Sequence, residues 1–419
     1  MQFSTESYRT RWLVLVTAWI LGAFVLLPQA AKVRDYLGLT SQLGLRGQPE
    51  ASTPLKQIYP VFAADALVWV RHSLALIEGD DIRLRYTTID NAPTGREVHW
   101  NSAWAWAIAG AGWVHHLFTG TPLPSSVEKA TMWLNPLMLL LLTILISAWV
   151  TKRAGIIIGT VVVVAMTCSD RLYEGFFPGY VDHHGLLTVT AFALMLGAVF
   201  MGAGWWQPSS PTSDPILPDS PEKARTAAIF SAVSGACGLW VSAASAIPPV
   251  ALVGFAGVVA IIIQGRHATR TGAVFDGQTW RTWGRVGAGA SFAFYLLEYF
   301  PQHLSLRMEP NHPLHALAWL GAGELIAQFG ERWLGRDTHR WSNLNRLVWP
   351  MLALLAGPLV IVIGGSKVFV VLDPFMSRLH NDYIQEFLPL WRTLQAFDAK
   401  ALFQVVGLGS VPLIAGTSG

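Results

Sequence analysis

The first long apolar segment of the chain reads WLVLVTAWILGAFVLLPQAA and occupies residues 12–31. About 20 apolar residues in a row are enough for a helix to cross the hydrocarbon core of a bilayer. Arg9 and Arg11 precede the segment, and a cleavable signal peptide would have a shorter apolar core. The segment therefore predicts a retained signal anchor with its N-terminus in the cytoplasm.

Similar apolar runs recur along the rest of the 419 residues. They lie at about 130–150, 154–168, 184–204, 226–245, 248–264, 285–300, 313–330, 346–371 and 401–416. The chain is 52% hydrophobic and only 13% charged, whereas soluble domains carry roughly 25% charged residues. We therefore predict an all-α polytopic membrane protein of about ten spans. The net charge of +3 is too small to indicate a nucleic-acid partner.

Basic residues gather in alternate loops between these runs. The loops predicted on the N-terminal side hold Lys152, Arg153, Lys223, Arg225, Arg266, Arg270, Arg281, Arg285, Arg332, Arg336, Arg340 and Arg346. Cytoplasmic loops are enriched in Lys and Arg, so this pattern predicts an inner-membrane protein with a cytoplasmic N-terminus. Outer loops are then expected at 32–129, 169–183, about 301–312 and 372–400, and 205–223 is expected to be a flexible cytoplasmic linker.

The whole chain, residues 1–419, is interpreted as a single transmembrane domain with large extracytoplasmic loops. One apolar stretch, 100–120, is shorter and interrupted by glycine, and counting it as a span would place the later arginines outside. We expect it to be an interfacial helix within the first outer loop.

The sharpest local motif is PGYVDHH at residues 178–184, where the second outer loop enters a span. Asp182 and His184 stand two residues apart at a helix start, so both side chains are able to face one cation. Asp182 is equally well placed to cap the helix. Spacing alone leaves both interpretations open.

Two further carboxylates occupy comparable positions in outer loops. Asp65 begins an apolar stretch in the first loop, and Glu386 lies in the loop after the ninth span. Each alone is typical of a solvated loop acid. Together with Asp182 and His184 they would form a set of hard ligands suited to Mg²⁺ or Mn²⁺.

These residues resemble the motifs of the oligosaccharyltransferase catalytic subunits, membrane enzymes of the C-type glycosyltransferase fold. Asp65 resembles the first-loop Asp of that family, residues 179–184 (GYVDHH) its D-x-D motif in the D-H-H form, and residues 384–386 (IQE) the end of its T-I-x-E motif. The three fall in the first, second and fifth outer loops, as the family requires. The resemblance covers roughly residues 10–416.

Two departures from the family pattern concern the acceptor. Tyr383 stands where the family motif has Thr or Ser. The sequence W-W-D-Y-G, which reads the acceptor sequon in the family's soluble domain, is not in this sequence. The chain is therefore expected to lack the family's C-terminal spans and soluble domain.

The resemblance implies an EC 2.4 glycosyltransferase that moves a sugar from a polyprenyl-(pyro)phosphate donor to a protein Asn. It implies Mg²⁺ or Mn²⁺ as cofactor, and the implied ligands are Asp65, Asp182, His184 and Glu386. Asp65 and Glu386 would also be catalytic, with Asp65 positioning the acceptor. Arg378 and Arg392 flank Glu386 and would pair with the donor phosphate, although loop arginines are commonly just solvated.

Three other functions compete with this one. A C-type glycosyltransferase acting on a lipid or a polysaccharide explains the missing sequon-reading motif. A transporter or flippase of lipid-linked sugars would place ionisable residues near the bilayer midplane, and here only Glu298 and Glu324 lie in or close to spans. The third is a degenerate assembly subunit, against which the retained motif acids argue.

Overall fold

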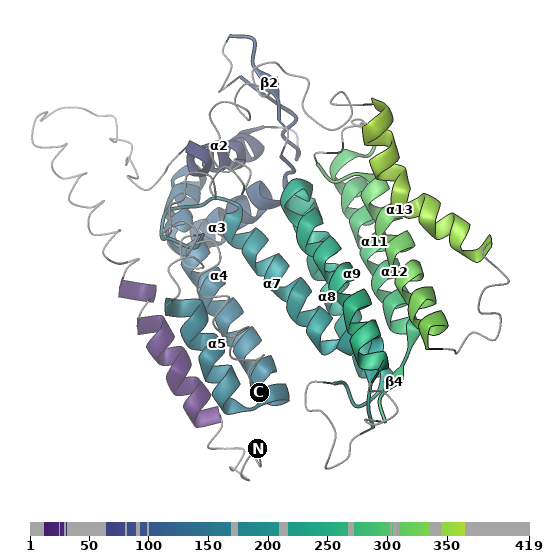
Figure 1. Cartoon of the computed structure of the whole chain (residues 1–419). Helices are drawn as coiled ribbons and strands as arrows, with labels where there is room; N and C mark the ends of the chain where they lie inside the picture. Colours follow the sequence, from purple (N-terminus) through teal and green to yellow (C-terminus); the bar gives the residue numbers. More distant parts are fainter. Residues whose placement is uncertain are drawn as a thin grey trace, which may run out of the picture.

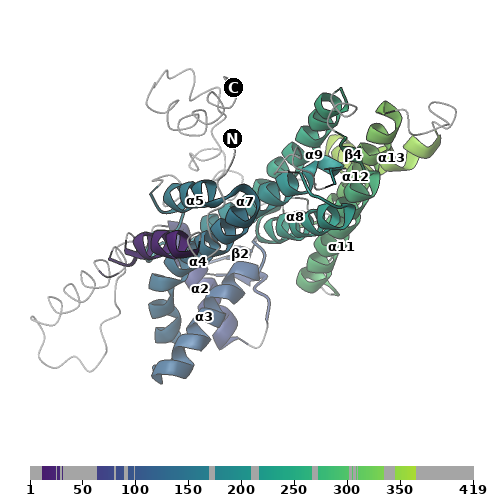
Figure 2. The same cartoon turned by 90° about the horizontal axis from the view of Figure 1, so that it is seen from below.

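The computed structural model describes residues 12–24, 26–28, 31, 64–79, 82–88, 93–98, 100–168, 175–208, 217–266, 272–301, 304, 308, 310–334 and 345–364. These residues form a bundle of helices with two very short pairs of antiparallel strands (Figures 1 and 2). The helices are Trp12–Pro28, α2 (Ala64–Glu78), α3 (Ala103–Thr119), α4 (Leu123–Ala154), α5 (Ile156–Cys168), α7 (His184–Phe200), η1 (Gly202–Gly204), α8 (Pro221–Val241), α9 (Ala243–Gly265), α11 (Gly277–Tyr299), α12 (Pro313–Trp333) and α13 (Asn345–Gly364). The strands are β1 (Tyr86–Thr87), β2 (Arg96–Glu97), β3 (Trp205–Trp206) and β4 (Val274–Phe275), paired as β1–β2 and β3–β4.

The helices confirm an all-α membrane protein. In the described residues, α4, α7 with η1, α8, α9 and α13 are each long and apolar enough to cross a membrane. α11 and α12 coincide with predicted spans but carry Arg281, Glu298 and Glu324, which lowers their hydropathy. The predicted span at 401–416 lies outside the described residues.

Several predicted boundaries differ from the structure. α11 begins at Gly277 rather than near residue 285, so Arg281 and Arg285, predicted in a cytoplasmic loop, lie in the first three turns of this helix. α4 begins at Leu123 rather than near residue 130. A proline is well suited to the first turn of a helix, because the N–H groups of that turn have no carbonyl partner within the helix. The predicted flexible linker 205–223 is ordered where it is described: Trp205–Trp206 pairs with β4, and α8 begins at Pro221 after its Ser220 cap. Residues 209–216 of that linker lie outside the described part of the chain.

The helices pack in two groups that meet along α7. α2 and α3 lie on α4, and α4 on α5, with the N-terminal helix alongside, while α7, α8, α11, α12 and α13 pack each on the next (Figures 1 and 2). A close approach joins Gly284 of α11 and Gly323 of α12, where a Cβ added to Gly323 would lie 2.6 Å from the Gly284 Cα. Such close approach at small residues is how helices associate in lipid.

The described loops fall into two sets at opposite ends of the bundle. One end holds α2, the β1–β2 hairpin, the loop before α7 and the loop before α12; the other holds β3 and β4 (Figure 1). An ion pair links different segments of the chain at each end. Arg85 binds Glu298 at the first end, and Arg225 binds Asp276 at the second. These two sets are the ones that the arginine distribution predicts for the two faces of the membrane.

The predicted interfacial stretch 100–120 contains α3. The helix packs on α2 and α4 through Trp104, Ala105 and Ile108, which are buried. Its C-terminal half leaves Leu117 and Phe118 exposed. An exposed apolar end beside the first loop set is typical of a helix that contacts lipid at the interface.

Candidate metal centre

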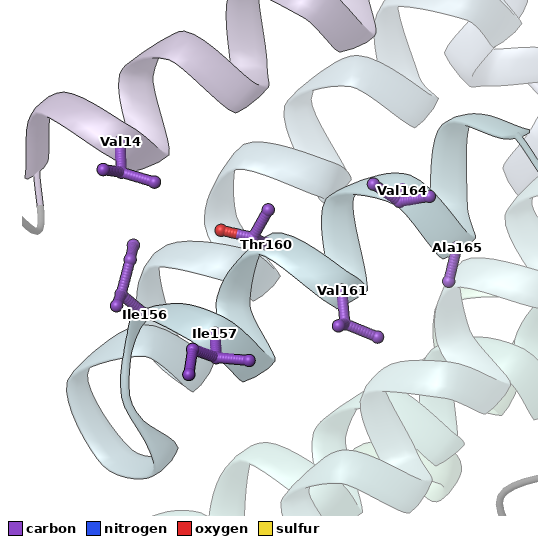
Figure 3. A pocket seen from close by; sticks show the side chains of 7 residues that line it. All are labelled: Val14, Ile156, Ile157, Thr160, Val161, Val164 and Ala165. Atoms are coloured by element: carbon purple, nitrogen blue, oxygen red, sulfur yellow. The ribbon is translucent and has the colours of Figure 1, made fainter. Parts of the chain in front are cut away.

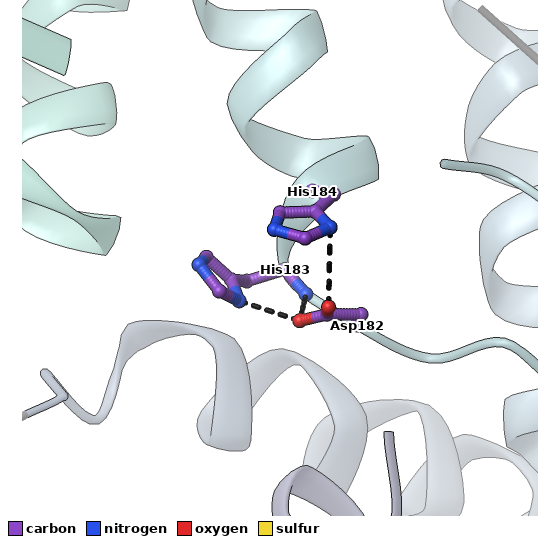
Figure 4. A group of neighbouring side chains, drawn as sticks. All are labelled: Asp182, His183 and His184. Atoms are coloured by element: carbon purple, nitrogen blue, oxygen red, sulfur yellow. Dashed lines mark hydrogen bonds and ion pairs between the residues drawn. The ribbon is translucent and has the colours of Figure 1, made fainter. Parts of the chain in front are cut away.

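A tight turn before α7 positions the candidate ligands. Gly179 has φ of 78°, a left-handed conformation in which glycine has no steric penalty. Val181 is fully buried, so it anchors the turn in the packing between α2, α3 and α4. His183 then caps α7 and His184 is its first residue. The three residues Asp182, His183 and His184 thereby converge in space (Figure 4).

The carboxylate of Asp182 is fully buried, and its two oxygens have different surroundings. Oδ1 lies 2.6 Å from the backbone N of His183, 2.5 Å from His183 Nδ1 and 3.1 Å from Trp69 Nε1. Oδ2 accepts a hydrogen bond of 3.1 Å from the Tyr180 hydroxyl and lies 3.2 Å from His184 Nδ1. Oδ2 lies on the more exposed side of the cluster, because the His184 side chain beside it is 36% exposed and the His183 side chain beside Oδ1 is 9% exposed.

These contacts keep Asp182 ionised. Burial by itself raises its pKa, but the hydrogen bonds from His183 and the charges of His183 and His184 outweigh burial and lower the pKa from 3.8 to about 2. The group is therefore a carboxylate at neutral pH. Because its pKa in the folded protein is depressed, the stability that it contributes is present at neutral pH and is lost as the pH falls towards about 2.

The spacing of Oδ2 and His184 Nδ1 fits a divalent cation. Neighbouring ligands of an octahedral ion at about 2.1 Å from the metal lie about 3.0 Å apart, and the observed separation is 3.2 Å. One nitrogen of His183 completes a set of three candidate ligand atoms that all lie within 4.8 Å of one another. The imidazoles favour a transition metal such as Mn²⁺, whereas Mg²⁺ would bind mainly through the carboxylate and further oxygen ligands.

An aromatic wall surrounds the buried side of this cluster. Trp69 and Trp100 stack with ring centroids 5.1 Å apart, and both lie near the His183 ring, at 5.4 and 6.1 Å. His72, one turn further along α2, packs edge-on against Trp69 and Trp100. The wall joins α2 and the segment before α3 to the loop before α7.

The predicted site residues are only partly within the described structure. Asp182 and His184 lie together as expected. Asp65 lies in the first turn of α2, one turn before Trp69, and its side chain is outside the described part. Glu386, Arg378 and Arg392 also lie outside the described residues, so their roles stay predictions.

Sequence reasoning gave no role to Trp69, Tyr180 and His183, all of which contact Asp182. The sequence does contain a pattern that places Trp69 near the site. Trp69 follows Asp65 by four residues, and residues four apart lie on the same face of a helix. Tyr180 and His183 were part of the quoted motif, but their geometry depends on the turn at Gly179.

The apolar groove beside the N-terminal helix is not a candidate site. It has a volume of about 490 Å³ and lies between that helix and α5 (Figure 3). Its lining consists of Val14, Ile156, Ile157, Thr160, Val161, Val164 and Ala165. With no ionisable group in this lining, the groove offers no chemistry.

Comparison with known proteins shows a likeness in fold. No protein-family model and no curated protein match the sequence. The structure is similar to the crystal structure of the apo oligosaccharyltransferase from Archaeoglobus fulgidus, with a TM-score of 0.50 and 14% sequence identity. The match covers 92% of this chain, which spans 40% of the length of that one. It confirms the predicted oligosaccharyltransferase-like fold.

Proposed function

We propose that this chain is a metal-dependent membrane glycosyltransferase. It would transfer a sugar or oligosaccharide from a polyprenyl-(pyro)phosphate to a protein Asn at the extracytoplasmic face of the inner membrane. The observation that carries the proposal is the pair of Asp182 Oδ2 and His184 Nδ1, 3.2 Å apart at one end of a bundle with an oligosaccharyltransferase fold.

Each residue of the proposed site has a distinct role. Mg²⁺ or Mn²⁺, when bound, would neutralise the phosphate that leaves the sugar. Asp182 and His184 would hold the ion, with Asp65 and Glu386 as further ligands. Asp65 would also accept a hydrogen bond from the acceptor amide, a poor nucleophile that needs positioning. Arg378 and Arg392 would bind the donor phosphate.

Ion pairing of the membrane acids favours an enzyme over a transporter. Glu298 binds Arg85 at one end of the bundle, and Glu324 binds Arg281, which also binds Glu331 near the other end. Transport sites typically hold ionisable groups near the midplane. Glu298 lies at the end of α11 and Glu324 near the middle of α12, but each is already paired with an arginine, which is typical of a structural anchor.

Direct assay of transfer tests the proposed function. The purified protein in detergent, given Mn²⁺ and a polyprenyl-diphosphate oligosaccharide, should glycosylate a peptide that carries an Asn-x-Thr sequon. Mass spectrometry of peptide and lipid fractions locates the sugar. Sugar found only on lipid would establish the alternative acceptor class, and failure of any transfer with Mn²⁺ or Mg²⁺ would refute the enzyme.

The proposed orientation makes a separate prediction. In a variant whose Cys168 and Cys237 are replaced by alanine, single cysteines at Thr94 and Glu222, both exposed, should react from opposite sides of the membrane. A membrane-impermeant maleimide added to spheroplasts should label Thr94→Cys at once and Glu222→Cys only after lysis. Labelling of Glu222→Cys first would reverse the proposed orientation.

A further inference from the structure

Trp69 is the buried group of α2 that reaches the candidate metal centre. Its side chain is 1% exposed, and its Nε1 lies 3.1 Å from both Asp182 Oδ1 and His183 Nδ1. The indole nitrogen always carries a proton and only donates. Which of the two atoms accepts this proton decides what Trp69 does to the site.

The short contact between His183 and Asp182 settles the acceptor. His183 Nδ1 lies 2.5 Å from the ionised Oδ1, a separation at which two bare lone pairs would repel. His183 therefore carries a proton on Nδ1 and donates it to Asp182. With Nδ1 occupied, the indole N–H of Trp69 has Oδ1 as its acceptor.

Oδ1 thus receives three donors, the Trp69 indole and the ring and backbone N–H groups of His183. A carboxylate oxygen has two lone pairs, so no position remains on Oδ1 for a cation. Oδ2 faces the partly exposed His184 and, among the described residues, accepts a hydrogen bond from the Tyr180 hydroxyl. The carboxylate is therefore held in one rotational setting, with Oδ2 turned toward His184.

We propose that Trp69 is a positioning residue of the metal centre: it holds Asp182 through Oδ1 so that Oδ2 alone, beside His184, binds the cation. The inference rests on the proposed cation site and goes beyond it, because it assigns the coordinating oxygen and the group that selects it. Partners that orient a metal ligand typically change affinity 10–100-fold when removed.

Two substitutions separate the N–H of Trp69 from its bulk. Trp69→Phe removes the donor and part of the ring. Replacement of Trp69 by β-(3-benzothienyl)alanine puts sulfur in place of the N–H and keeps the stacking on Trp100. Trp283→Phe is the matched control, because Trp283 is also 1% exposed and donates its indole N–H, to Ser231 Oγ at 3.1 Å within the bundle.

Binding of Mn²⁺, measured by the loss of the free-ion electron paramagnetic resonance signal, is the readout. Both Trp69 variants should bind Mn²⁺ about 10–100-fold more weakly than the wild type, and Trp283→Phe should bind it as the wild type does. The benzothienyl variant should still unfold in one cooperative transition well above the assay temperature, so its weaker binding would be due to the lost hydrogen bond and not to unfolding.

The outcomes distinguish this inference from the proposed function. Wild-type affinity in the benzothienyl variant would overturn the role of Trp69 and leave the cation site standing. A wild-type protein that binds no Mn²⁺ would overturn the cation site and this inference together. Equal weakening in Trp283→Phe would show a general effect of losing an indole and would also overturn the inference.

Discussion

Asp182→Asn should lower Mn²⁺ affinity at least about 100-fold and abolish sugar transfer, while leaving the bundle folded. The environment of Oδ1 gives the reason. Its three surrounding donors would fix the carbonyl oxygen of the new amide at the Oδ1 position. The amide NH₂ would then take the Oδ2 position beside His184. A donor group at that position cannot coordinate a cation.

Asp276→Asn is the matched control for this substitution. Asp276 also lies at the start of a helix, caps α11 by accepting from Gln278 N at 3.0 Å, and binds Arg225 at the other end of the bundle. Asn caps helices about as well as Asp, so this variant should fold and bind Mn²⁺ normally. Isothermal titration of both proteins in detergent makes the comparison. Asp182→Asn with affinity within threefold of the control would refute the cation site.

The positions of the helices could be predicted from the sequence because lipid imposes one simple requirement. A run of about 20 apolar residues must satisfy its own backbone hydrogen bonds, and the helix is the way to do so within one segment. The runs at 184–204 and 313–330 therefore match α7 and α12. The arginines then sorted the loops into two sets, since charge rather than packing decides the side of the membrane.

The boundaries and the contacts around Asp182 required the structure. Trp205 is held in place by pairing with β4, about seventy residues later in the chain. The hydropathy of the sequence does not reveal which strands pair. Trp69 meets Asp182 across 113 residues. A motif reveals which side chains are chemically able to bind a cation, but not which oxygen of Asp182 is already taken by hydrogen bonds.

A buried carboxylate, Glu298, joins four segments at the same end of the bundle as the candidate site. Its side chain is fully buried. Oε1 binds Arg85 Nη2 at 2.7 Å and accepts from the N–H and hydroxyl of Ser102, both at 2.8 Å. Oε2 accepts from Trp240 Nε1 at 3.0 Å. Glu298 thereby fastens the residues just after Trp100, which stacks on Trp69, to the ends of α8 and α11.

Glu298→Ala should therefore destabilise the protein by about 3–5 kcal/mol, the usual cost of leaving one member of a buried ion pair without its partner. Arg85 would keep its charge with a side chain only 10% exposed, and Ser102 and Trp240 would lose their acceptor. Asp219→Ala, which breaks the exposed pair with Lys223, should cost less than about 1 kcal/mol. Thermal unfolding in detergent, followed by circular dichroism, compares the two.

The double variant Arg85→Met/Glu298→Met makes this prediction sharper. Replacing both members of a buried pair by apolar groups removes the stranded charge, so the double variant should be more stable than Glu298→Ala, although Ser102 and Trp240 still lack their acceptor. A coupling energy from the complete cycle of single and double methionine variants isolates the pair from those other bonds. Effects of Arg85→Met and Glu298→Met that simply added would contradict the pairing. Loss of Mn²⁺ affinity in the double variant despite recovered stability would show that the 100–102 segment holds its place against Trp69 because Glu298 fastens it to α11.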